Sequence, residues 1–166
     1  MRRASLLLVL FLYLCSACAT SDFSAAPVVE NRDATLEALA IDELVRCAES
    51  GEEIAVLELA RRYADGNGTQ QDALVALELY KVIAESASDK AVVAQTRIGR
   101  LYMEGVSPIK QDFVEAYIWF DRVITDRGRD VVVDKERVLR LHNFSRLNMT
   151  DAERIELIKR LESSAY

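Results

Sequence analysis

The stretch Tyr63-Ala64-Asp65-Gly66 returns later in the chain as Tyr102-Met103-Glu104-Gly105. The residues in front of each stretch also correspond, since Leu59-Ala60 precedes the first and Ile98-Gly99 precedes the second. A period of about 40 residues is typical of stacked pairs of helices, in which each pair buries the apolar side of its neighbour. The sequence therefore predicts an all-α fold that contains two copies of one helical hairpin.

Each copy carries residues that suit a tight hairpin. Gly66 and Gly105 are expected to end the first helix with a positive φ. Asp72 and Asp112, which follow a shorter and a slightly longer loop, are expected to cap the second helix by accepting its free amide hydrogens. The residues to which we assign a structural role in the repeats are Ala55, Leu59, Ala60, Tyr63, Gly66, Asp72, Ala76, Tyr80, Ala94, Ile98, Gly99, Tyr102, Gly105, Asp112, Ala116 and Trp119.

The run from Gly51 to Tyr80 resembles a Sel-one-like repeat, a relative of the tetratricopeptide repeat. The second copy departs from that pattern, with Lys90 in place of the opening glycine and Val106-Ser107-Pro108 in place of the second loop glycine. The resemblance implies antiparallel helix hairpins stacked into a short right-handed α-solenoid. It places repeats at about 51–87 and 90–126 in a helical domain of residues 33–166, with capping helices at both ends.

The flanks of the repeats supply the expected caps. Residues 33–50 have the apolar spacing of an amphipathic helix, which would replace the second helix of a preceding repeat. Residues 129–144 form a charged helix in this interpretation. Thr150 and Glu153 make a capping box that starts a last helix. The C-terminal cap is therefore expected at about 129–163.

The N-terminus has the three parts of an export signal. Arg2 and Arg3 precede an apolar run over residues 4–14, which is too short to cross a bilayer. Cys15-Ser16-Ala17-Cys18 resembles the bacterial lipobox, although Cys15 stands where an aliphatic residue is usual. We expect a signal peptide at 1–17, a lipid on Cys18 and a flexible tether over 18–32.

This signal predicts an exported protein in the periplasm, anchored by its lipid to the outer membrane. The alternative is ordinary cleavage near Ala17-Cys18-Ala19, which would give a soluble periplasmic or secreted protein and leave Cys18 able to form a disulfide with Cys47.

Composition and motifs exclude several classes of function. A net charge of −6 and a pI near 4.9 argue against nucleic-acid binding, which needs clustered Lys and Arg. Ser107-Pro108-Ile109-Lys110 matches the S-x-x-K pattern of penicillin-recognising enzymes, but its companion motifs are missing. His142 is the only histidine and has no Cys/His cluster around it. We therefore expect no enzyme, no cofactor and no metal site, with a Ser107–Lys110 cell-wall amide hydrolase or penicillin-binding protein as the alternative.

A protein or peptide partner fits the repeat best. In repeats of this kind the first helices line the concave face, and Arg61 and Arg100 occupy equivalent positions in the two copies. With Arg62 and Arg97 they are expected to form a basic strip for an acidic peptide or a C-terminal carboxylate. We therefore predict an envelope adaptor. The alternatives are that these charges only keep the surface soluble, or that the groove accepts another copy of the protein in a self-assembling structure.

Overall fold

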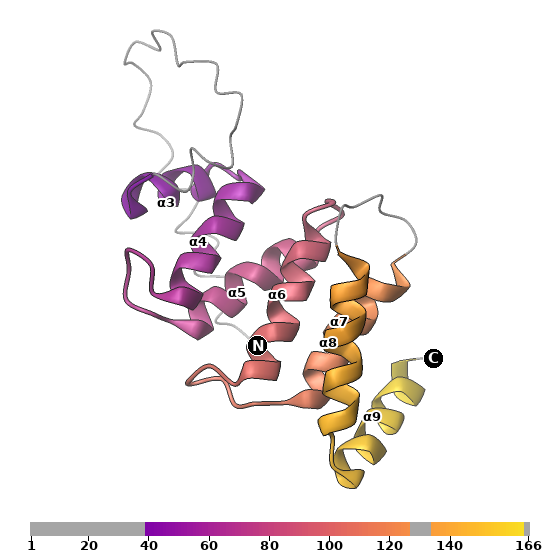
Figure 1. The fold of residues 1–166 in the computed structure, drawn as a ribbon. Coiled ribbons are helices and arrows are strands. Elements are labelled where there is room, and N and C mark those ends of the chain that lie inside the picture. Colours follow the sequence, from indigo (N-terminus) through magenta and orange to yellow (C-terminus); the bar gives the residue numbers. More distant parts are fainter. Residues whose placement is uncertain (1–38, 127–133, 165–166) are drawn as a thin grey trace, which may run out of the picture. The chain divides into compact units, whose positions relative to one another are not determined.

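The computed structural model describes residues 39–126 and 134–164, and every regular element in these ranges is an α-helix (Figure 1). The expected signal peptide, Cys18 and the tether lie outside the described residues. In the labels of Figure 1 the helices are α3 (Ile41–Glu49), α4 (Glu53–Asp65), α5 (Ala73–Ala84), α6 (Ala91–Glu104), α7 (Phe113–Thr125), α8 (Lys135–Asn148) and α9 (Asp151–Ser164).

The two predicted hairpins are α4–α5 and α6–α7, and their first helices end in the same way. Gly66 and Gly105 adopt left-handed φ values of 71° and 67°, and their N–H groups donate to the carbonyls of Arg62 and Leu101. The side-chain amides of Gln71 and Gln111 then donate to a carbonyl of the preceding helix, at 2.8 and 2.9 Å. The greater length of the second loop therefore leaves these hydrogen bonds unchanged.

The second helices also start alike. The backbone N–H of Asp72 donates to the carbonyl of Tyr63 at 2.8 Å, and that of Asp112 donates to the carbonyl of Tyr102 at 2.9 Å. Both aspartate side chains accept amide hydrogens from the first turn that follows. Each tyrosine packs between two of the buried clusters. Tyr63 and Tyr102 thus have equivalent surroundings, as a true repeat requires.

Helices pack in a regular order along the chain. Contacts are most extensive within the hairpins, and α3, α5 and α7 each pack on the helix that follows, α4, α6 and α8. Ala55, Ala76, Ala94 and Ala116 are fully buried at these interfaces, where small side chains let helices approach closely. This succession is the all-α solenoid that the sequence predicts.

The ends of the described chain differ from the expected boundaries. Helix α3 begins at Ile41, because Ala40 is extended with a ψ of 153°. Residues 33–38 of the expected N-terminal cap lie outside the described residues. The charged helix expected to end at Phe144 continues to Asn148, and it stops where Met149 becomes extended. Beyond it the capping box of Thr150 and Glu153 is present, with hydrogen bonds in both directions.

Candidate functional site

The first helices of successive hairpins leave two adjoining hollows between them. The hollow between α4 and α6 has a volume of about 280 Å³, and the one between α6 and α8 about 330 Å³. Val93 and Arg97 of α6 border both hollows, which we call together the basic groove. The other residues lining the basic groove are Ile54, Leu57, Glu58, Arg61, Tyr80, Lys90, Thr96, Arg100, Asp134, Arg137, Val138 and Leu141.

The lining of the basic groove has a charge opposite to that of the chain. Five of its side chains are basic and two are acidic, a formal charge of +3 in a protein of net charge −6. Apolar side chains, including Leu57 and Leu141, lie between the charges. This combination suits a ligand that brings carboxylates together with small apolar groups.

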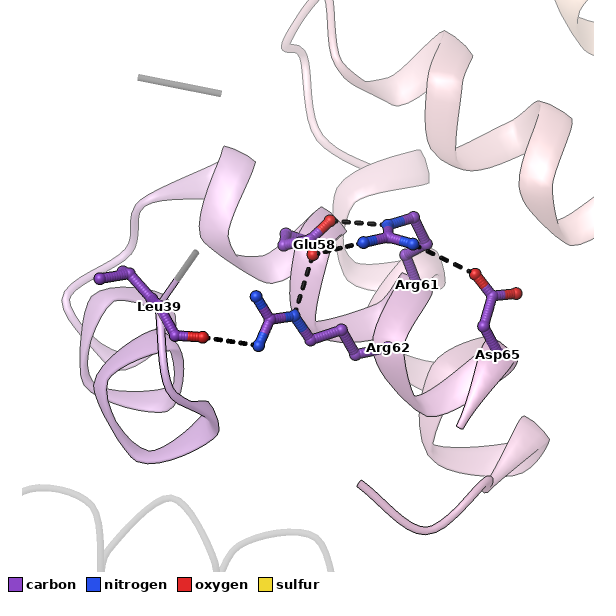
Figure 2. Close-up of polar contacts among 5 residues, drawn as sticks. All are labelled: Leu39, Glu58, Arg61, Arg62 and Asp65. Carbon is purple, nitrogen blue, oxygen red and sulfur yellow. Dashed lines mark hydrogen bonds and ion pairs between the residues drawn. The ribbon is translucent and has the colours of Figure 1, made fainter. Parts of the chain in front are cut away.

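Two of the arginines expected in the basic strip are held by one carboxylate. Glu58 accepts two hydrogen bonds from Arg61, both at 2.7 Å, and one from Arg62 at 2.9 Å (Figure 2). Arg61 also pairs with Asp65 at 3.4 Å. Burial raises the pKa of Glu58, but the hydrogen bonds from the two guanidinium groups outweigh it and leave this pKa below its usual value.

Arg62 does not lie in the basic groove, which corrects the expectation that it belongs to the strip. Its side chain is only 7% exposed, and it donates to the carbonyl of Leu39 at 2.7 Å (Figure 2). Arg62 therefore links α4 to the chain that precedes α3. The sequence placed it beside Arg61, but neighbours along a helix point about 100° apart and seldom share a face.

Arg97 and Arg100 do border the basic groove, and they differ in their partners. Arg100 forms an ion pair with Glu104 of its own helix at 2.8 Å. Arg97 makes no ion pair with any residue that the structure describes, and it lies half-buried close enough to lower the pKa of Tyr80. Burial dominates at that hydroxyl and raises its pKa to about 12, so Tyr80 stays neutral at ordinary pH.

The sequence analysis missed the wall of the groove that α8 supplies. The spacing that separates Asp72 from Asp112 also separates Arg97 from Arg137, and buried Ile98 from buried Val138. Helix α8 also packs on α7 as α6 packs on α5. It is therefore the first helix of a third, incomplete repeat, and this recurring spacing was the signal that could have found it.

The residues of the alternative hydrolase do not form a catalytic arrangement. Ser107 and Lys110 are both exposed in the loop between α6 and α7, whereas the S-x-x-K pattern requires the serine at the start of a helix. His142 lies at the interface of α8 with α7, where its ring stacks on Tyr117. The histidine and the Ser–Lys pair thus occupy separate places.

No described helix is long and apolar enough to span a membrane.

These features define the chain as a short α-solenoid of helix hairpins whose first helices line one basic groove. The two hairpins match the family model of the Sel1 repeat, over residues 54–88 and 92–122. Sel1 repeats generally serve as modules for protein–protein interaction.

Two solved structures are similar to this chain. One is a protective antigen present in uropathogenic Escherichia coli strains that displays an SLR fold, with 23% identity and a TM-score of 0.55 over 71% of this chain. The chain spans 23% of the length of that antigen, so this likeness concerns the fold alone. The other is a Sel1 repeat protein from Oxalobacter formigenes, with 21% identity and a TM-score of 0.40, covering 72% of this chain and 97% of that protein. No curated protein matches the chain.

Proposed function

We propose that the protein is an adaptor that holds an acidic segment of a partner protein in the basic groove. The observation that carries this proposal is the position of Arg97, which borders both hollows and has no acidic partner among the residues of known position. A half-buried guanidinium of this kind binds a carboxylate through two parallel hydrogen bonds, more strongly than an exposed lysine would.

The rest of the groove supports an extended ligand. Arg61 and Arg100 flank Arg97 along the first helices, and both keep intramolecular carboxylate partners that a ligand would have to share. Ile54 and Leu57 offer apolar surface beside Arg97 in the first hollow. Hollows of about 300 Å³ take single side chains of a peptide and are too small for a folded domain.

We also propose that the adaptor acts at the bacterial envelope, tethered by a lipid on Cys18. The basis is the signal-like sequence over residues 1–17 and its resemblance to a lipobox. The tether of residues 18–32 would let the basic groove reach partners near the membrane that holds the lipid.

Fluorescence anisotropy with a labelled tetraglutamate peptide that has a free C-terminus tests the groove. We expect saturable binding that weakens as salt is added, because the contacts are largely electrostatic. Arg97→Glu should weaken the affinity about tenfold or more, since it replaces a charge-assisted pair with a repulsion.

Arg46→Glu is the matched control, because it makes the same charge change at an exposed position of α3 that does not line the groove. It should leave the affinity within about twofold of the original, as expected for a distant screened charge. Equal losses of affinity in Arg97→Glu and Arg46→Glu would mean that binding depends only on the net charge of the protein. Failure of the original protein to prefer tetraglutamate over tetralysine would refute the proposal.

A further inference from the structure

Tyr80 of α5 is a buried side chain whose hydroxyl has no hydrogen-bond partner among the residues that the structure describes. The residue is only 2% exposed, and it borders the first hollow of the basic groove, which lies between α4 and α6. The charges of Arg97, Arg61 and Glu58, which line the same hollow, all act on this hydroxyl. A buried tyrosine hydroxyl usually has a partner, because an unmade hydrogen bond costs stability. The hydroxyl of Tyr80 is therefore a donor available to a ligand in the first hollow.

The second repeat shows that packing at this position does not require the hydroxyl. Phe120 corresponds to Tyr80 by the 40-residue spacing that also relates Asp72 to Asp112. The ring of Phe120 is fully buried, and it does not border the hollow between α6 and α8. The two rings occupy equivalent places in the core, but Tyr80 brings a polar atom to the groove whereas Phe120 does not. A polar atom that the packing does not need indicates a role in binding.

The other polar side chains of the first hollow also leave donors without partners. Its one carboxylate, that of Glu58, accepts from Arg61 through both oxygens at 2.7 Å and from Arg62 at 2.9 Å (Figure 2). Arg97 and Lys90 border the hollow and form no ion pair with any residue of known position. Together with the tyrosine hydroxyl, these two cations leave three donor groups around one space. The ligand group that satisfies them must be a negatively charged acceptor.

The apolar lining of the first hollow limits what can carry this acceptor. Ile54, Leu57 and Val93 supply the apolar surface, and the volume of about 280 Å³ gives room for a short side chain. Such a space suits the two methylene groups of a glutamate or the small side chain of a C-terminal residue. A carboxylate on a short aliphatic chain therefore matches both the donors and the apolar surface.

We propose that the first hollow is the carboxylate subsite of the basic groove, with Tyr80 as its specificity-determining residue. The hydroxyl of Tyr80 donates to one oxygen of the bound carboxylate, and the guanidinium of Arg97 donates to the same carboxylate from α6. This inference rests on the proposed function and names the group by which the acidic segment is recognised. The carboxylate belongs to an acidic side chain or to the free C-terminus of the segment, since both present the same two oxygens. Tyr80 stays neutral at ordinary pH, so its hydrogen bond adds affinity that salt screens little.

Fluorescence anisotropy with labelled tetraglutamate at several salt concentrations tests this subsite. We expect Tyr80→Phe to weaken the affinity about tenfold, because a hydrogen bond to a charged group is lost. The salt dependence of the affinity should stay that of the original protein, since Tyr80→Phe changes no charge. Arg97→Gln should weaken the affinity and also reduce its salt dependence. The double variant should lose less than the two single losses predict, because both groups hold one carboxylate.

Tyr102→Phe is the matched control, because it removes a tyrosine hydroxyl that lies outside the basic groove. It should bind tetraglutamate within about twofold of the original affinity, as residues outside the contact usually do. Circular dichroism and urea unfolding check that Tyr80→Phe keeps the fold. We expect it to do so, since phenylalanine occupies the equivalent position in the second repeat.

Two further peptides identify the source of the carboxylate. Tetraglutamate with an amidated C-terminus offers only side-chain carboxylates, whereas tetraglutamine with a free C-terminus offers only the terminal one. The loss of affinity in Tyr80→Phe should appear with the peptide that supplies the carboxylate to the first hollow. The absence of a loss with every peptide would overturn the subsite.

The remaining outcomes separate this inference from the proposed function. Unchanged affinity in Tyr80→Phe, alongside weaker binding by Arg97→Gln, would overturn the subsite and leave the proposed function in place. Equal losses in Tyr80→Phe and Tyr102→Phe, or strictly additive losses from Tyr80→Phe and Arg97→Gln, would overturn the subsite as well. An original protein that does not bind tetraglutamate would overturn the proposed function and the subsite together.

Discussion

At Gly99 the second repeat has no room for a side chain. A Cβ atom added there would lie 2.6 Å from a ring carbon of Phe120, which is itself fully buried. The first repeat has Ala60 at this position, opposite Tyr80. The smaller residue in the second repeat is therefore explained by the position of the facing ring, and not by any demand on the backbone, since this glycine lies inside a regular helix.

We expect Gly99→Ala to destabilise the protein, although alanine is the better helix former. Overpacking of a core typically costs about 1–3 kcal/mol, whereas the gain in helix propensity is about 1 kcal/mol. The net change in the free energy of unfolding, measured in urea, should therefore be a loss.

Replacing Phe120 with leucine in the same chain provides the check on the mechanism. Phe120→Leu alone removes buried volume and should destabilise, but it also removes the atoms that the new methyl group would strike. The double variant should be more stable than the sum of the two single losses predicts. If the losses in the free energy of unfolding from Gly99→Ala and Phe120→Leu simply add, the clash with the Phe120 ring is not the cause of the first loss.

At the scale of a single element, α8 shows how an incomplete repeat is held. His142 of this helix corresponds to Tyr102 of the second repeat, and therefore also to Tyr63 of the first. The ring centroid is 4.0 Å from that of Tyr117, and the Nε2 atom lies 3.6 Å from a carboxylate oxygen of Asp121. The side chain is 12% exposed.

Burial lowers the pKa of His142 below its ordinary value of 6.5, and Asp121 only partly opposes this effect, while Arg146 adds to it. The unfolded chain therefore binds a proton at a higher pH than the folded chain does. Stability must fall as the pH drops from above 6.5 toward the lower pKa of the folded state.

We expect the melting temperature to decrease between pH 7.5 and pH 5.5, and we expect His142→Phe to reduce this decrease. Phenylalanine keeps an aromatic ring against Tyr117 but does not titrate in this range. Carboxylates such as Glu58 titrate equally in both proteins, so the difference between the two curves isolates the histidine. Parallel curves would mean that the packing of α8 on α7 does not depend on a neutral His142.

At the scale of the whole molecule, the proposed lipid anchor would act together with the charge of the chain. A chain with a net charge of −6 repels acidic partners at a distance, and the basic groove opposes that repulsion locally. Attachment to a membrane would raise the local concentration of the adaptor around envelope partners, which matters for a short groove with few contacts.

Metabolic labelling with radioactive palmitate in the native bacterium tests the anchor. We expect label in the original protein and none in Cys18→Ser, which should accumulate as an unmodified form. Cys47→Ser is the matched control, because Cys47 lies on α3 within the folded domain and should not alter labelling. Label that persists in Cys18→Ser would show that a residue other than Cys18 carries the lipid.

Much of the fold follows from short-range patterns that can be read along the chain. The repeat period, the glycines at 66 and 105 and the aspartates at 72 and 112 determine where helices begin and end, because caps and left-handed residues act within one turn. The same period placed Arg61 and Arg100 on one side of the array.

The tertiary structure alone decided which side chains share a partner within the chain and which remain available to a ligand. Arg61 and Arg62 are neighbours in the sequence, yet Arg61 borders the groove whereas Arg62 is buried and donates to the carbonyl of Leu39. Long flexible side chains can reach several acceptors, and the choice depends on elements distant along the chain. For the same reason only the tertiary structure showed that His142 of α8 lies against Tyr117 of α7.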